Sequence, residues 1–196
     1  MATLDEEKQA LRVRARKMRL VGDQKEGPIA AAAAAGHLLP RIDEIGIRPG
    51  SVVAGYWPIA TEIDDRPLLA RLHERGCVCA LPIVVARGAP LAFRRWAPLD
   101  DVEPGEHETW QPPASAPEVV PDVVVVPLVA FDAEGWRLGQ GVGYYDRTLQ
   151  ALRAAGPVVA IGIAYAAQRF GAVPHGPLDQ PLDWLLSEQG LTRARR

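Results

Sequence analysis

The sequence predicts an α/β protein with three layers, α/β/α, in which a mostly parallel central sheet lies between helices. The strand-like segments are continuous apolar runs, and they alternate with segments of helical pattern. Runs such as DVVVVPLVAF (residues 122–131) and PVVAIGIAY (157–165) are typical of parallel strands, which are buried on both faces. The length of 196 residues fits a single domain over 1–196 better than two.

Two helices are expected at the start of the chain. The first covers residues 3–21, where Thr3 and Glu6 have the spacing of a capping box. The second covers residues 29–46, whose alanine run has high helix propensity, and Pro40 is expected to end or kink it.

Strands and helices then alternate along the rest of the chain. Residues 51–59 are expected to form a buried strand followed by a loop. Further strands are expected over 77–85, 89–98, 122–131 and 157–165, and helices over 62–76 and 144–156. Residues 98–121 are rich in proline and are expected to form a long irregular loop of the kind that often carries function. A second loop over 166–181 leads into a short closing segment, LDWLLSEQG.

Composition narrows the classes of function. The formal net charge of −2 disfavours a general nucleic-acid binder and a protein of anionic membrane surfaces. The first residues, MATLDEEKQALR, lack the apolar stretch of a secretory signal, and no apolar run is long enough to span a bilayer. We therefore expect a soluble, cytoplasmic protein, and we expect it to be a monomer. Cys77 and Cys79 are expected to be small core residues, because no further His or Cys follows at a metal-binding spacing.

The segment RLGQGVGYYDR (residues 137–147) follows an expected strand and precedes an expected helix. Gly139, Gly141 and Gly143 alternate with other residues, so backbone N–H groups could approach an anion without side-chain clashes. The dipole of a helix that starts near Tyr144 would add to anion binding. The pattern matches neither a Walker A loop nor G-x-G-x-x-G, because no Lys-Ser/Thr follows and Tyr144 occupies the place of the third glycine.

Two interpretations of this glycine segment remain open from the residues alone: a tight turn before a helix, or a phosphate cradle. Arg137 and Arg147 favour phosphate, which arginine binds through paired hydrogen bonds, and Asp146 would suit a Mg²⁺ ion beside it. Lys8, Arg12 and Arg16 lie four residues apart and share one helix face. That face is either a solvated charged surface or a clamp on nucleotide phosphates.

Four ordered stretches together resemble the 5-formyltetrahydrofolate cyclo-ligase family, also called methenyltetrahydrofolate synthetases. They are RLGQGVGYYDR, KQALR (8–12), VAGYWPIATEID (53–64) and VPHGPLDQPLDWLLSEQG (173–190), and they extend over nearly the whole chain. The expected architecture is then of the NagB/RpiA/CoA-transferase-like kind. The resemblance implies an ATP-dependent ring closure in which 5-formyltetrahydrofolate and MgATP give 5,10-methenyltetrahydrofolate, ADP and phosphate.

The resemblance also implies roles for individual residues. ATP would be bound by Lys8, Arg12, Arg137, Leu138, Gly139, Gln140, Gly141, Val142, Gly143, Tyr144 and Tyr145. Arg137, Tyr144 and Asp146 would act in catalysis; Trp57, Glu62 and Tyr144 would bind the folate; and Asp146 and Asp179 would hold Mg²⁺. Taken alone, Trp57 could equally be a core residue, Glu62 a helix-start carboxylate and Asp183 a cap of the closing segment.

The chain departs from the family pattern at three places. Gln140 stands where a basic residue is usual, Leu178 stands where His is common, and Gln111 stands where Glu is usual. These departures favour an alternative in which the chain is a non-catalytic folate-binding or storage module. An isomerase or CoA-transferase-like activity is a further alternative that rests on fold analogy alone.

Overall fold

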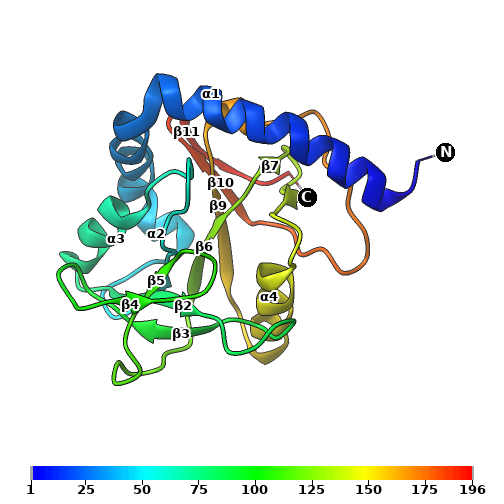
Figure 1. The fold of residues 1–196 in the computed structure, drawn as a ribbon. Helices are drawn as coiled ribbons and strands as arrows, with labels where there is room; N and C mark the ends of the chain where they lie inside the picture. The colour runs from blue at the N-terminus through cyan, green and yellow to red at the C-terminus, as the bar shows by residue number, and fades with distance from the viewer. Residues whose placement is uncertain (1, 196) are drawn as a thin grey trace.

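The computed structural model describes residues 2–195 and confirms the α/β fold with a mostly parallel central sheet. Seven strands form that sheet in the order β11-β10-β9-β6-β1-β2-β3 (Figure 1). The five inner strands are parallel to one another: β1 (Val52–Ala54), β2 (Val78–Ile83), β6 (Val123–Pro127), β9 (Val159–Ile163) and β10 (Trp184–Ser187). The edge strands β3 (Ala92–Arg95) and β11 (Gly190–Arg193) are antiparallel to the strands beside them.

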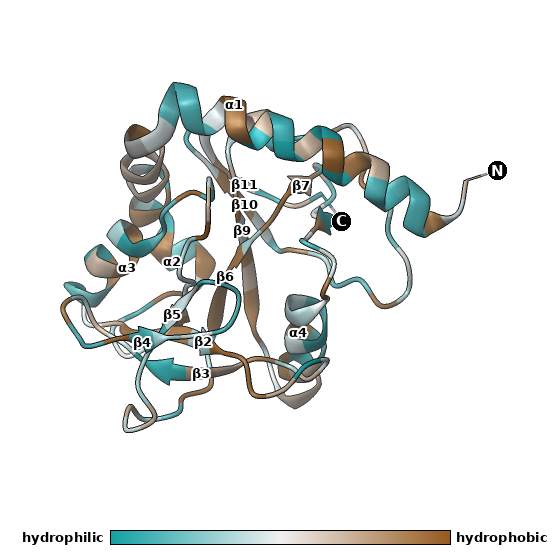
Figure 2. Cartoon of the chain, viewed as in Figure 1, coloured by the Kyte–Doolittle hydropathy of each residue, from teal (hydrophilic) through white to brown (hydrophobic). Residues whose placement is uncertain are grey.

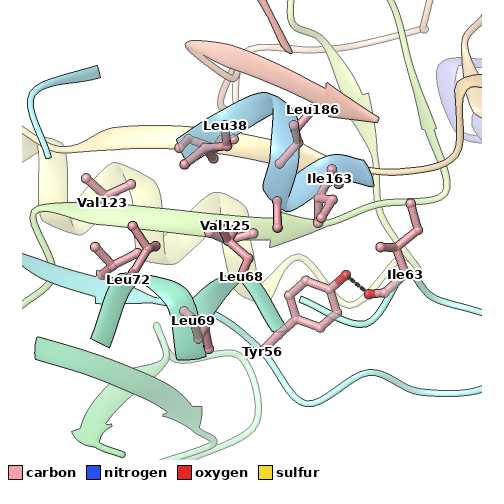
Figure 3. Close-up of a cluster of buried hydrophobic side chains, with 14 of the residues drawn as sticks. Leu38, Tyr56, Ile63, Leu68, Leu69, Leu72, Val123, Val125, Ile163 and Leu186 are labelled. Carbon is pink, nitrogen blue, oxygen red and sulfur yellow. Dashed lines mark hydrogen bonds between the residues drawn. The ribbon is translucent and has the colours of Figure 1, made fainter. Parts of the chain in front are cut away.

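Alternate residues of the inner strands enter two separate cores, as the twofold side-chain period of a strand requires. Val53, Val123 and Val125 pack on one face against α1 (Leu4–Leu38) and α3 (Arg66–His73), in the cluster that Figure 3 shows. On the opposite face, Ala54 and Val124 belong to a cluster that contains Leu149 of α4 (Tyr144–Ala155). Helices thus cover both faces, and Figure 2 shows the apolar strands β6 and β9 between them.

Helix α1 joins the two helices that the sequence predicts as separate. It is continuous from Leu4 to Leu38 apart from a kink at Gly27, whose φ of 18° and ψ of −113° are not helical. The capping box of Thr3 and Glu6 is present. The helix ends before Pro40, which lies in a 3₁₀ turn, η1 (Leu39–Arg41), followed by α2 (Ile42–Ile45).

Three other expected boundaries were wrong. Helix α3 begins at Arg66 instead of residue 62, because Pro67 suits only the first turn of a helix. Strand β6 ends at Pro127, and Ala130–Phe131 forms β7, which pairs with β8 (Arg137–Leu138). The closing segment continues into β11.

The two expected loops contain short elements of their own. The long loop contains a small hairpin of β4 (Glu103–Pro104) and β5 (Trp110–Gln111). A 3₁₀ turn, η2 (Ala166–Gln168), begins the later loop.

The order of the strands creates a switch point between β1 and β6. From β1 the chain continues to β2 on one side, and it later returns to β6 on the other side. The connections that follow β1 and β6 therefore run toward opposite edges of the sheet. In open parallel sheets, a crevice at the carboxyl ends of such strands is the usual place for a ligand.

Two smaller expectations concern the cysteines and membranes. Cys77 and Cys79 are buried free thiols, as predicted, and Cys79 Sγ donates to the carbonyl oxygen of Leu69 at 3.2 Å. Burial raises the pKa of the Cys79 thiol to about 12. Within residues 2–195, no helix has both the length and the apolar character needed to cross a membrane.

Candidate functional site

A cleft of about 380 Å³ opens at the switch point, beyond the carboxyl ends of the strands. Its walls include Tyr56 after β1 and Leu128 after β6, and the hairpin β4–β5 contributes His107 and Trp110. Many of the residues singled out in the sequence line it: Trp57, Glu62, Arg137, Gly139, Gln140, Val142, Gly143, Tyr144, Tyr145 and Asp146. The structure therefore brings the glycine segment and the 53–64 segment to one cleft.

The glycine segment runs from β8 directly into the N-terminus of α4. Gly141 and Gly143 have φ angles of 113° and 76°, in the region that favours glycine, and Gly143 is the N-cap of the helix. A Cβ atom at Gly143 would lie 2.9 Å from Nη1 of Arg147. Around Gly139, in contrast, nothing lies within 4 Å of where a Cβ would be, so an anion could approach the backbone there. Leu138 is a core residue behind the loop.

The predicted cationic face of α1 lies against the glycine segment and the loop before β10. Lys8 Nζ is 2.5 Å from Oδ2 of Asp179. Arg12 Nε donates to the carbonyl oxygen of Gly139 at 3.0 Å, and Arg16 Nη2 donates to Oε1 of Gln140 at 3.0 Å. Arg12 and Arg16 are thus directed at the glycine segment, and Lys8 is directed at the loop before β10.

Arg137 and Asp146 form a partly buried ion pair at the floor of the glycine segment. Arg137 Nη2 lies 2.8 Å from Asp146 Oδ1, and Nη1 donates to the carbonyl oxygen of Gln180. The backbone N–H of Gln180 in turn donates to Asp146 Oδ1 at 2.9 Å. Burial lowers the pKa of Arg137, and the carboxylate of Asp146 opposes that shift. The pair thus fixes the glycine segment to the loop that carries Asp179.

The opposite wall of the cleft contains the expected folate-binding residues. Glu62 has a side chain that is 7% exposed, and burial raises the pKa of its carboxyl group. Trp57 packs partly on the core and also lines the cleft, where its ring centroid is 6.4 Å from that of Trp110. The rings of Tyr144 and His107 lie 5.9 Å apart. The hairpin therefore contacts residues of both predicted subsites.

Sequence reasoning missed several residues of this site. Arg19 is buried and contacts Glu62, and its position three residues after Arg16 continues the row that begins at Lys8. That spacing could have identified Arg19 from the sequence. His107 and Trp110 reach the cleft from a loop whose length alone indicated function, so no local pattern could have identified them.

The donor set suits a Mg²⁺ ion that arrives with a nucleotide better than a resident metal. Within the described residues 2–195, no three His, Cys, Asp or Glu side chains gather as a metal centre. Asp146 and Asp179 are both tied to the same short loop, since Asp146 accepts from Gln180 N–H and Asp179 accepts from Gly176 N–H at 2.6 Å. Mg²⁺ commonly takes one or two carboxylates together with phosphate oxygens and water.

Comparison with known protein families shows to which family the chain belongs. The model of the 5-formyltetrahydrofolate cyclo-ligase family matches residues 4–188. The chain belongs to this family. Within the cyclo-ligase family, the chain is 29% identical to the 5-formyltetrahydrofolate cyclo-ligase of Haemophilus influenzae over 182 residues, which is 90% of this chain and 95% of that protein. It is 33% identical to the Escherichia coli K12 cyclo-ligase over 135 residues, 66% of this chain and 74% of the relative.

Solved structures of cyclo-ligase family members share the fold. The 5,10-methenyltetrahydrofolate synthetase of Aquifex aeolicus matches with a TM-score of 0.76 at 28% identity, covering 96% of this chain and 93% of that one. The corresponding synthetase of Mycoplasma pneumoniae matches with a TM-score of 0.70 at 23% identity, covering 92% and 98%, and this likeness concerns the fold alone.

Proposed function

We propose that this chain catalyses the ATP-dependent conversion of 5-formyltetrahydrofolate to 5,10-methenyltetrahydrofolate, with release of ADP and phosphate. One observation carries the proposal. The cleft at the switch point has the glycine segment and Arg137 on one side and a buried carboxylate with aromatic rings on the other, and cations of α1 contact the glycine segment. Membership of the cyclo-ligase family, which implies the use of ATP, supports the same conclusion.

The reaction requires positioning and charge stabilisation more than a protein nucleophile. The formyl oxygen is a poor leaving group until it receives the γ-phosphoryl group of ATP. N10 of the folate then attacks the activated formyl carbon, the C–O bond breaks, and phosphate departs as N10 loses its proton. The residues of this cleft supply donors and cations to both partners.

Lys8, Arg12 and Arg137 would bind the phosphates together with backbone N–H groups of the glycine segment. Lys8 and Arg137 now pair with Asp179 and Asp146, so they would exchange a carboxylate for a phosphate when the nucleotide enters. A Mg²⁺ ion held by those two carboxylates would neutralise phosphate charge. Each donor that is aimed at developing charge can contribute about 3–4 kcal/mol to transition-state stabilisation.

The folate would lie on the opposite wall. The carboxylate of Glu62 would accept hydrogen bonds from N–H groups of the pterin, while Trp57 and Tyr144 would contact its flat ring. One chain supplies every residue named here, so we propose that a monomer is the working unit and that residues 1–196 form a single domain.

Incubation of the purified protein with MgATP and 5-formyltetrahydrofolate tests the proposal. We expect the methenyl product and ADP to appear in equal amounts, and neither to appear without ATP. Folate binding with no ADP release would instead support the non-catalytic storage module. Product formed without ATP would contradict both.

A further inference from the structure

Arg19 is a buried cation that connects α1 to the segment between β1 and α3. The residue is 8% exposed, and buried arginines are retained where they have fixed partners. Its Nε donates to Oγ1 of Thr61 at 3.0 Å, and its Nη1 lies 3.4 Å from Oε1 of Glu62. The planar guanidinium thus contacts two neighbouring residues of the folate wall, and it fixes their position relative to the helix.

Both carboxylate oxygens of Glu62 have a partner within the protein. Oε1 faces Arg19, and Oε2 accepts from the backbone N–H of Ile59 at 3.1 Å. Each oxygen of an ionised carboxylate has two lone pairs, so Glu62 can still accept further bonds from a ligand in the cleft. Burial favours the protonated form of this group, and Arg19 favours the ionised form.

Gln140 lines the cleft together with Glu62. Its Oε1 accepts from Nη2 of Arg16 at 3.0 Å, and its side chain opposes the rise in the pKa of the Glu62 carboxyl group. A neutral amide can accept from a cation, whereas lysine or arginine could only donate. The amide of Gln140 therefore contacts α1 without adding a charge to the cleft.

We propose that Arg19 is a positioning residue for Glu62, which holds its carboxylate directed into the cleft for a ligand with adjacent N–H donors. The proposal rests on the proposed function in one respect, the identity of that ligand as 5-formyltetrahydrofolate.

Glu62 in turn acts on the buried hydroxyls of Tyr56 and Tyr145, whose pKa both burial and its negative charge raise. Both phenols therefore stay neutral through the ordinary assay range. Asp65 lies near both phenols, and burial raises the pKa of its carboxyl group well above the usual value. His107 also lines the cleft, and it is unchanged in every variant compared below.

Equilibrium binding of 5-formyltetrahydrofolate, followed by tryptophan fluorescence, tests the role of Arg19 directly. We expect Arg19→Gln to raise Kd at neutral pH at least about 10-fold, because the carboxylate of Glu62 loses the cation that holds it in place. As the pH is lowered, folate binding should be lost at a higher pH in Arg19→Gln than in the parent protein; we call this pH the acid limit of binding. Arg19→Lys keeps a charge and should return the acid limit toward that of the parent. Lys17→Gln, an exposed residue of the same helix, is the matched control and should change neither quantity.

Steady-state kinetics distinguish a positioning role of Arg19 from a general loss of active structure. In Arg19→Gln we expect KM for folate to rise while kcat and KM for ATP stay within about twofold. An unmoved acid limit in Arg19→Gln, or equal changes for both substrates, would overturn the inference. If the parent protein binds folate without turnover, the proposed function fails, and the binding data still decide the role of Arg19.

Discussion

Asp65 is a carboxyl group with no exposed surface, next to the loop that follows β1. Its Oδ2 accepts from the backbone N–H of Tyr56 at 3.0 Å, while Oδ1 has no hydrogen-bond partner among the described residues. A Cβ at position 55 would collide with Asp65 and the side chain of Leu69, so Gly55 is what allows the close approach. Burial raises the pKa of Asp65 well above its usual value.

This pKa makes stability depend on pH in a definite direction. Between the ordinary carboxyl pKa and the raised one, the folded state binds more protons than the unfolded state, so the free energy of unfolding falls as pH rises. Glu62 adds to the fall because its pKa is also raised. We expect Asp65→Asn to flatten the decline of melting temperature above about pH 4. An unchanged slope, measured by circular dichroism across the range, would show that Asp65 is ionised in the folded protein.

Asp146 allows a second test at the level of one residue. Asp146→Asn keeps the shape of the side chain but removes the charge that faces Arg137 and the proposed Mg²⁺. We expect turnover to fall and the Mg²⁺ concentration for half-maximal rate to rise by at least about 10-fold, and the melting temperature to fall because the buried Arg137 loses its carboxylate partner. The control is Asp43→Asn, which alters an exposed carboxylate on α2. A normal Mg²⁺ dependence would remove Asp146 from the metal-binding role.

Two of the three glycines in helix α1, Gly22 and Gly36, have surroundings that differ sharply. A Cβ at Gly22 would lie 2.6 Å from the Cβ and Cγ atoms of Tyr165, whereas a Cβ at Gly36 would meet nothing within 4 Å. We expect Gly22→Ala to destabilise the protein by about 1–3 kcal/mol through overpacking. Gly36→Ala should stabilise it by about 0.5–1 kcal/mol, because glycine loses more entropy in a helix. Urea denaturation measures both, and equal effects would show that the helix shifts away from Tyr165.

Elements were predictable where pattern and local chemistry agree. The capping box at Thr3 and the strand at residues 157–165 follow from spacing and from continuous apolar character. The break between β6 and β7 was not predictable, because the apolar run continues through Leu128 and Val129 into another core cluster. The position of the cleft could not be predicted from local sequence either. Local sequence identified the glycine segment, but only the strand order brings it beside Trp57.

At the scale of the whole molecule, the ion pair of Lys8 with Asp179 connects the first helix to the loop before β10. Binding of MgATP there should stabilise the folded chain by about 2.7 kcal/mol at a ligand concentration 100 times Kd. We expect Lys8→Met to reduce this ligand-induced rise in melting temperature. Lys25→Met, which removes an exposed lysine near the kink, should keep the full rise. A full rise in Lys8→Met would exclude Lys8 from nucleotide binding.

Four cations on α1 occupy positions 8, 12, 16 and 19, and they contact, in turn, the loop before β10, the glycine segment twice, and the folate wall. Because a helix rises 1.5 Å per residue, Lys8 and Arg19 are about 16 Å apart along the axis. Under the proposed function, the helix would therefore fix the separation between the residues that bind the nucleotide and those that bind the folate. Inserting one residue between Arg12 and Arg16 would rotate the later contacts by about 100° around the axis, so both halves could fold while the two substrates no longer met.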